Sequence, residues 1–126
     1  MAEWKKRSKR KASGGRYKMS HKKKVRDTGE TPVYTKFGTE GKSREKRSTG
    51  GNRIHALKIA SHANVAMKGG SIKQFKIMSV VENTASRTFV RQGVISKGAI
   101  IKVEKGLARV TSRPTRDGIV NAILLK

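Results

Sequence analysis

The chain has 126 residues, enough for one domain or for a smaller domain with an arm, and it carries 31 Lys and Arg against 8 Asp and Glu, a net charge of +23. So basic a balance indicates a polyanionic partner, and nucleic acid is favoured over an anionic membrane because no apolar run reaches the ~18 residues of a spanning helix. With no cysteine, the sequence excludes disulfides, thiolate metal sites and thiol catalysis.

Charged and apolar residues are distributed differently along the chain. Residues 1–53 hold 18 Lys and Arg with 5 acids, and residues 54–126 hold 13 with 3, which together make the totals of 31 and 8. Only the second part has enough apolar residues to build a core. We therefore expect an extended basic arm over residues 1–30 and a folded domain over residues 31–126, with the basic segment 42–53 entering that domain.

The arm combines dense cations with a glycine pair and two aromatic residues. Cations this close together repel one another, so we expect the arm to stay extended until a polyanion orders it. Gly14 and Gly15 allow a sharp turn or a close approach to phosphate. Trp4 and Tyr17 are candidates either for stacking on unpaired bases or for packing back on the domain. The candidate RNA-binding residues of the arm are Trp4, Lys5, Lys6, Arg7, Lys9, Arg10, Lys11, Ser13, Gly14, Gly15, Arg16, Tyr17, Lys18, Lys22, Lys23, Lys24 and Arg26.

Two further segments precede the apolar part of the domain. Residues 31–37 are rich in strand formers and predict a short strand that begins near Pro32. Residues 42–53 repeat the composition of the arm and are typical of a basic strand or loop. Arginine ranks above lysine for specific contacts because its guanidinium pairs bidentately with phosphate and stacks on bases. The candidates in this segment are Arg44, Lys46, Arg47, Gly50, Gly51 and Arg53.

From residue 52 onward the pattern is mainly that of β-strands. Alternating apolar and polar residues predict strands over 52–60 and 72–81, separated by a turn over 68–71. At the end of the second strand, Val80 and Val81 are both apolar, which indicates burial on both faces of the sheet.

One helix is predicted over residues 83–92, capped by one of its first two residues and ended by Gly93. Arg87 and Arg91 lie four residues apart on one helix face and could clamp a phosphate. After it, strands over 99–104 and 107–112 form a hairpin. A turn and a last strand follow. The candidate RNA-binding residues of this part are Arg87, Arg91, Arg113 and Arg116.

The turn covers residues 113–118 and the last strand covers residues 119–125. Several short strands at nearly regular spacing predict a mainly β fold class, a small antiparallel β-barrel with one short helix and the extended basic N-terminal arm.

Catalysis has little support in the sequence. No ordered set of carboxylates accompanies His21, His55 or His62, and residues 68–71 lack the spacing of a nucleotide-binding loop. We therefore expect no enzymatic activity, no metal, no cofactor and no small-molecule substrate.

Several short motifs occur in a fixed order along the chain: RKASGG at 10–15, TGGNR at 49–53, VVEN at 80–83, ISKGAII at 95–101, and ARVTSRP with DG within 108–118. In that order they resemble the archaeal and eukaryotic-type small-subunit ribosomal protein number eight of the e series, which is distinct from the bacterial-type protein eight. The resemblance spans residues 4–125, and the compact length is similar to the archaeal form.

The resemblance implies a structural protein of the cytoplasmic ribosome, present in single copy, whose β-barrel and basic extension both contact small-subunit rRNA. Neighbouring small-subunit ribosomal proteins are its other implied partners. An alternative that shares the charge is a nucleoid- or chromatin-type nucleic-acid-binding protein. Such a protein should bind duplex DNA at least as well as structured RNA, so affinities measured at matched salt separate the two interpretations.

Overall fold

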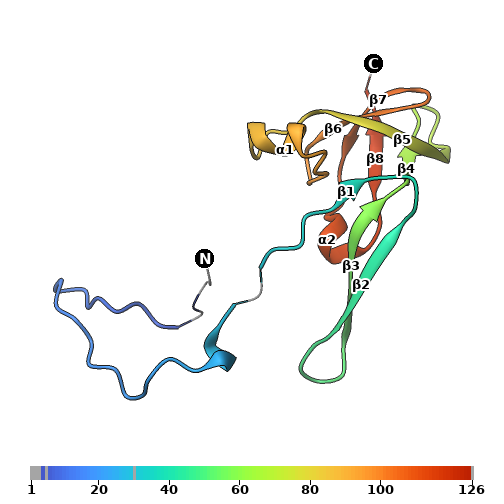
Figure 1. Cartoon of the computed structure of the whole chain (residues 1–126). Coiled ribbons are helices and arrows are strands. Elements are labelled where there is room, and N and C mark those ends of the chain that lie inside the picture. Colours follow the sequence, from blue (N-terminus) through green and yellow to red (C-terminus); the bar gives the residue numbers. More distant parts are fainter. Residues whose placement is uncertain (1–3, 5, 30, 126) are drawn as a thin grey trace. The chain divides into compact units, whose positions relative to one another are not determined.

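The computed structural model describes residue 4, residues 6–29 and residues 31–125. The chain divides into two compact units, Met1–Pro32 and Val33–Lys126 (Figure 1). The first unit has little regular structure, whereas the second contains a three-stranded sheet, a closed barrel and two short helices.

The arm contains one element, the 3-10 helix η1 (Val25–Asp27). Two isolated antiparallel bridges shape the rest: Arg10 faces Arg16, and Trp4 faces Thr28. The second bridge joins segments near the two ends of the arm, so the arm forms a loop instead of the extended ribbon expected from charge repulsion. That expectation overlooked Asp27, which provides a local anion for the cations of the loop.

A three-stranded sheet with strand order β1-β3-β2 lies outside the barrel. It is built from β1 (Lys36–Phe37), β2 (Lys42–Arg47) and β3 (Arg53–Ala60). The basic segment 42–53 thus supplies a strand and the turn of an antiparallel hairpin, while β1 pairs with β3 in parallel. The strand predicted over 31–37 is only two residues long, because only Lys36 and Phe37 pair with β3.

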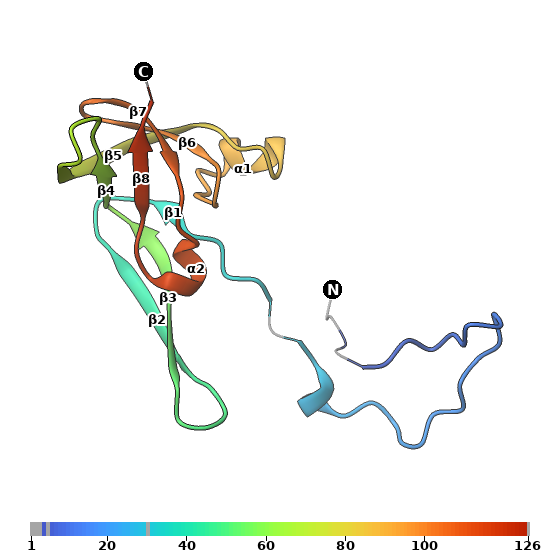
Figure 2. The same ribbon diagram turned by 180° about the vertical axis from the view of Figure 1, so that it is seen from behind.

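Five strands close into a barrel in the order β4-β5-β6-β7-β8 (Figure 2). They are β4 (His62–Ala66), β5 (Ile72–Glu82), β6 (Ile100–Val103), β7 (Gly106–Val110) and β8 (Asn121–Leu124). Four neighbouring pairs are antiparallel, and the parallel pair of β4 with β8 closes the ring. The predicted small β-barrel is confirmed, with a parallel closure and with β4 as a strand that the sequence pattern did not indicate.

Small and branched side chains fill the barrel. A ring of only five strands has a narrow interior, so Ala and Val alternate with a few Ile at the inward positions. Each buried Val or Ile contributes about 1.5–3 kcal/mol through the apolar surface that it removes from water. The buried core residues are Ala60, Ala63, Val65, Ile77, Val80, Ile95, Ile101, Val103, Ala108, Val110, Val120 and Ala122.

The end of β5 is buried on one face only. Val80 is buried, but Val81 is 48% exposed, so the prediction of burial on both faces is wrong. The pairing of β5 with β6 is irregular between Ile77 and Ser79 and again between Val80 and Glu82. Irregular pairing of this kind shifts which residues point inward, and two consecutive apolar residues then do not mark a fully buried strand.

Helix α1 (Arg87–Arg91) is shorter than predicted and is capped by Ser86, whose hydroxyl accepts a hydrogen bond from the backbone N–H of Thr88. The first residue of the predicted helix, Asn83, is buried instead. Its side-chain nitrogen donates to the carbonyl of Val94, and its side-chain oxygen accepts from the hydroxyl of Ser96 and the backbone N–H of Ala85. Asn83 thus fastens the loop that follows the helix, and the helix begins only after Ser86.

Helix α2 (Pro114–Asp117) occupies the segment for which a turn was predicted. Pro114 is the first helical residue, where its missing N–H costs nothing. The carboxylate of Asp117 accepts a 2.8 Å hydrogen bond from the backbone N–H of Arg113. Gly118 ends the helix in the left-handed conformation, with φ of 72°.

Candidate nucleic-acid interface

The first cluster of cations in the arm, residues 9–16, lies on a tight turn and is exposed to solvent. The backbone N–H of Lys11 donates to the carbonyl of Gly15 at 2.8 Å, and that of Tyr17 donates to the carbonyl of Lys9 at 2.9 Å. Gly14 has φ of +85°, a conformation that other residues adopt only at a cost. The guanidinium of Arg10 donates to the carbonyl of Gly14 at 3.0 Å. The turn therefore presents its exposed residues on a defined backbone: Lys9, Arg10, Lys11, Ser13, Gly14, Gly15 and Arg16.

Cations contact both aromatic rings of the arm. The guanidinium of Arg7 lies over the ring of Tyr17, 4.0 Å from its centroid, and also donates to its hydroxyl at 2.7 Å. The ammonium of Lys23 lies 5.0 Å from the centroid of the Trp4 ring. These cation–π contacts hold the rings in place within the arm.

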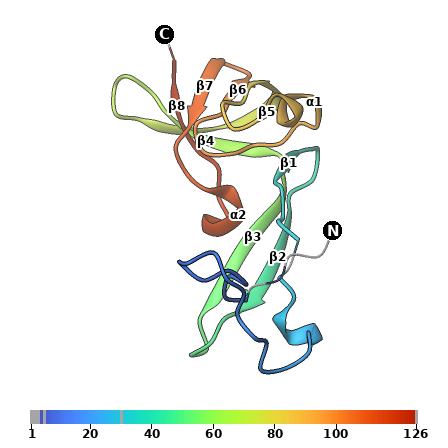
Figure 3. The ribbon, with the colours of Figure 1, turned by 90° about the vertical axis from the view of Figure 1, so that its left-hand side faces the viewer.

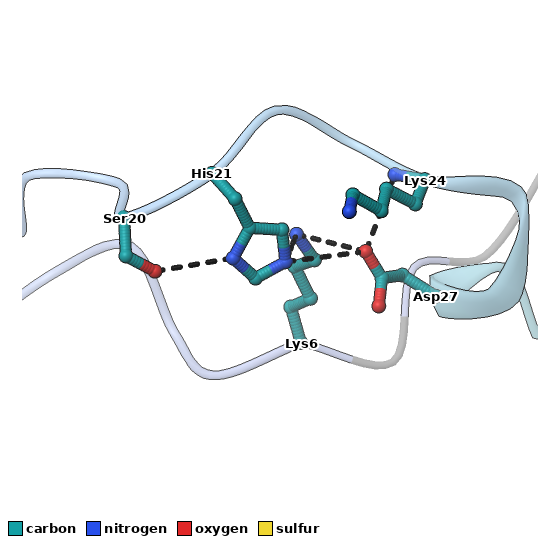
Figure 4. Close-up of polar contacts among 5 residues, drawn as sticks. All are labelled: Lys6, Ser20, His21, Lys24 and Asp27. Atoms are coloured by element: carbon teal, nitrogen blue, oxygen red, sulfur yellow. Dashed lines mark hydrogen bonds and ion pairs between the residues drawn. The ribbon is translucent and has the colours of Figure 1, made fainter.

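Asp27 gathers the polar groups that close the arm (Figure 4). Its Oδ2 atom lies 2.9 Å from the ammonium of Lys6, accepts from the backbone N–H of Lys24 at 3.2 Å, and lies 3.6 Å from Nε2 of His21. Ser20 contacts the other ring nitrogen of His21 at 3.1 Å. Asp27 was not among the candidate residues predicted from the sequence, although an acid within a run of cations is a recognisable signal of a local ion pair.

The Asp27 side chain is only 17% exposed, so its pairing with Lys6 is partly shielded from solvent. The hydrogen bond from Lys6 is the main cause that lowers the pKa of Asp27 below its ordinary value of 3.8, although desolvation opposes it. The carboxylate is therefore charged at neutral pH and keeps Lys6 engaged. Lys6 thus serves to close the arm, unlike the exposed cations around it.

The remaining arm cations are exposed on the loop: Lys18, Lys22, Lys23, Lys24 and Arg26. The candidate Lys5 lies outside the described residues.

The β2–β3 hairpin, residues 42–60, carries cations on both of its faces. Every residue of β2 is exposed. The register places Arg47 directly opposite Arg53, while Arg44 faces Ala56 and Lys46 faces Ile54. Like charges directly opposite each other destabilise a strand pair. An anion bound beside Arg47 and Arg53 would remove this repulsion.

Glu45 offsets part of this charge. Its carboxylate lies 3.0 Å from the guanidinium of Arg53, and both side chains are well exposed. An exposed pair of this kind contributes little to stability, at most about 1 kcal/mol. The hairpin therefore keeps a strongly positive surface.

Gly50 and Gly51 form the tip of the hairpin, each with φ of +83°. No atom lies within 4 Å of the position that a Cβ would take at either residue, so the backbone conformation alone requires glycine. The tip is thus free of side-chain bulk, and its backbone is accessible to a phosphate group.

The rest of the domain supports the base of the hairpin. Figure 3 shows β2 and β3 running together away from the barrel, with α2 beside β3. A Cβ atom at Gly118 would lie 3.0 Å from the carbonyl oxygen of His55, so the end of α2 packs closely on β3. On the same strand, the carbonyl of Leu57 accepts a 2.6 Å hydrogen bond from the buried hydroxyl of Thr35. The hairpin is therefore a supported projection.

The arginines of the helices are exposed, as the candidate interface requires. Arg87 and Arg91 stand at the first and last positions of α1. Arg113 caps α2 and Arg116 lies within it, which brings both arginines to the element that packs on β3. The structure thus groups Arg113 and Arg116 with the hairpin.

An aromatic packing contact outside the candidate interface was not predicted from the sequence. The rings of Tyr34 and Phe89 meet at a centroid distance of 5.1 Å, and Phe37 packs against Gly93. Tyr34 and Phe37 are both exposed. The spacing of these residues gives no sign of the contact, because the segment before β1 and helix α1 are far apart in sequence.

Within the described ranges, no group of three or more His, Cys, Asp or Glu side chains is arranged to hold a metal ion. Over the same residues, no helix has the length and apolar character needed to cross a membrane.

The chain is similar to a known protein family over nearly its whole length. The family model described as "Ribosomal protein S8e" matches residues 4–125. The chain is 39% identical over 124 residues to the "Small ribosomal subunit protein eS8" of Methanospirillum hungatei, covering 98% of this chain and 99% of the relative. It is 45% identical to the protein of that name from Methanoculleus marisnigri and 43% identical to that from Methanocorpusculum labreanum, with 98% of both chains covered in each case.

Proposed function

This chain belongs to the ribosomal protein S8e family, and from that premise we propose that it binds the RNA of the small ribosomal subunit through its arm and its β2–β3 hairpin. Membership of the family makes the chain a structural component of the small subunit, located in the ribosome in the cytoplasm, and not an enzyme.

The single observation that carries the proposal is the like-charge surface of the hairpin. β2 is exposed along its whole length, and Arg47 faces Arg53 across the strand pair. A projection of this kind gains little from its own fold, because its outer half buries almost nothing. Phosphates placed along it would offset the repulsion and release condensed counterions, which is the main source of affinity for a nucleic-acid backbone.

The folded domain and the basic segments have different proposed roles. The domain of residues 31–126 anchors the protein, and the arm of residues 1–30 with the segment 42–53 neutralises phosphates. Contacts of this kind read the shape of folded RNA more than its sequence. We also propose that the protein contacts neighbouring small-subunit proteins and is present in a single copy per ribosome.

The test compares small-subunit rRNA fragments with duplex DNA at matched salt. With about eight phosphates neutralised, the logarithm of the affinity for RNA should fall with the logarithm of the salt concentration at a slope of about −6 to −7. A slope shallower than about −2 contradicts phosphate neutralisation. Equal or tighter binding of duplex DNA contradicts the assignment to rRNA and favours a nucleoid-type protein.

A further inference from the structure

The arm lines a cavity of about 400 Å³ that is partly open to solvent. This volume falls within the range of about 300–1,000 Å³ that small-molecule sites occupy. Every residue that lines it belongs to the arm, and five of these residues are Lys or Arg. The lining also includes both aromatic residues of the arm, Trp4 and Tyr17, together with Met19. Aromatic rings among cations suit a ligand that has both a flat apolar part and a negative charge.

The cavity offers two surfaces on which the flat part of such a ligand can stack, the ring of Trp4 and the guanidinium of Arg7. The Trp4 ring is 40% exposed, and the bridge to Thr28 fixes the backbone that carries it. Arg7 also lines the cavity and lies over the ring of Tyr17. Bases of single-stranded RNA stack both on aromatic rings and on guanidinium planes, so the two surfaces suit the same class of ligand.

Asp27, which also lines the cavity, makes one part of its wall negatively charged. Its carboxylate is charged and contacts Lys6, Lys24 and His21 (Figure 4). A bare phosphate would be repelled at this wall, whereas an uncharged base would be tolerated. The cavity thus fits a base near Asp27 and phosphates near the exposed cations, which together make up a nucleotide.

We propose that this cavity binds one unpaired nucleotide that is extruded from an RNA helix, with the base stacked on Trp4 and the flanking phosphates held by the lysines and arginines of the arm. This inference rests on the proposed function and names a ligand for the arm. Asp27 acts as a positioning residue, because its contacts with Lys6 and the backbone of Lys24 keep the loop closed around the base.

The test uses the full chain and two RNA hairpins, one with a single bulged nucleotide and one that is fully paired. Trp4 is the only tryptophan of the chain, so its fluorescence reports on this cavity alone. The bulged hairpin should quench the fluorescence and bind about tenfold more tightly than the paired one, in line with the gain from stacking one base on an aromatic ring. Equal affinity and equal quenching for the two hairpins overturn the inference.

Variants then assign the preference to the ring. Trp4→Ala should abolish the preference for the bulge and leave the salt slope unchanged, while Trp4→Phe should retain most of it; because both variants lack the fluorophore, their affinities are measured by filter binding of labelled RNA. Tyr34→Ala removes an exposed aromatic ring outside the arm and serves as the matched control, with the preference intact. Retention of the preference in Trp4→Ala, or its loss in Tyr34→Ala, contradicts the assignment to this cavity.

The two proposals fail in different ways. If both hairpins bind equally with a steep salt slope, the nucleotide cavity is wrong and the proposed function stands. If neither hairpin binds, both proposals fail.

Discussion

Different forces stabilise the barrel and the arm. In the barrel, branched apolar side chains such as Val65 and Ile101 are removed from water. In the arm, the closing contacts are one carboxylate with its partners and two rings with cations. Apolar burial depends little on salt or pH, whereas ion pairs and cation–π contacts depend on the charges of a few groups. The barrel therefore carries the stability of the protein, and the arm carries a surface that responds to a polyanion.

The largest expected effect lies in the barrel core. Ile101→Ala should lower the free energy of unfolding by about 2–5 kcal/mol, because it leaves a cavity among side chains that cannot close over it. Urea unfolding followed by circular dichroism measures this change. Ile123 is 53% exposed on β8, so Ile123→Ala is the matched control, with a change of about 0.5 kcal/mol or less. Similar losses for both variants contradict the assignment of the core.

The next effect concerns the support of the hairpin by α2. Gly118→Ala should destabilise the domain by more than the roughly 1–2 kcal/mol of the left-handed conformation, because its Cβ would also approach His55. Gly70 has φ of +78° with no atom near its Cβ position, so Gly70→Ala isolates the conformational cost. Thermal unfolding of the two variants compares them. An equal loss for both would show that α2 does not pack tightly on β3.

A smaller effect sharpens the role of the hairpin surface. Arg47→Gln should weaken RNA binding and make the salt slope shallower by about 1, because one phosphate contact is lost. It should leave the stability unchanged or slightly higher, since the repulsion with Arg53 disappears. Lys102→Gln removes an exposed cation from the barrel strand β6 and should leave the slope unchanged. If Lys102→Gln changes the slope as much as Arg47→Gln does, the hairpin is not the principal contact.

The smallest effect is the response of the arm to pH. Because the folded-state pKa of Asp27 lies below its ordinary value of 3.8, the closed arm gains stability that is fully present above that value. This gain is lost as the pH falls through the folded-state pKa. Trp4 fluorescence should therefore change below pH 3.8. In Asp27→Asn this transition should be absent, and its persistence there would show that another group controls the closure.

Local sequence patterns predicted much of the barrel domain. Alternation indicated β3 and β5, and Gly93 marked the end of α1. These features depend on neighbours in sequence, where residue type and spacing determine the conformation. The hairpin of β6 with β7 was predicted for the same reason.

Features that depend on distant contacts were not predictable. The parallel pairing of β4 with β8 joins residues such as Val65 and Ala122, and no local pattern records it. Asparagine is a residue type that often caps helices, yet the side chain of Asn83 forms hydrogen bonds with the loop at residues 94–96. Ile72 and Ile123 resemble core residues in the sequence but face outward.

The candidate site shows the same limit. The cations and glycines of the arm and the hairpin were identified from composition alone. Asp27, an acid within a run of cations, carries a sequence signal of a local ion pair, but its partner Lys6 is identified only when the arm closes. The packing of Tyr34 on Phe89 was missed because the two segments are distant in sequence.

The most direct measurement is ultraviolet crosslinking of RNA to this protein in purified small ribosomal subunits, with the crosslinked peptides identified by mass spectrometry. The account predicts that the crosslinked residues lie mainly in residues 4–26 and 42–53, with Trp4 among them. Crosslinks confined to the outer face of the barrel strands, with the arm and the hairpin free of RNA, would contradict it.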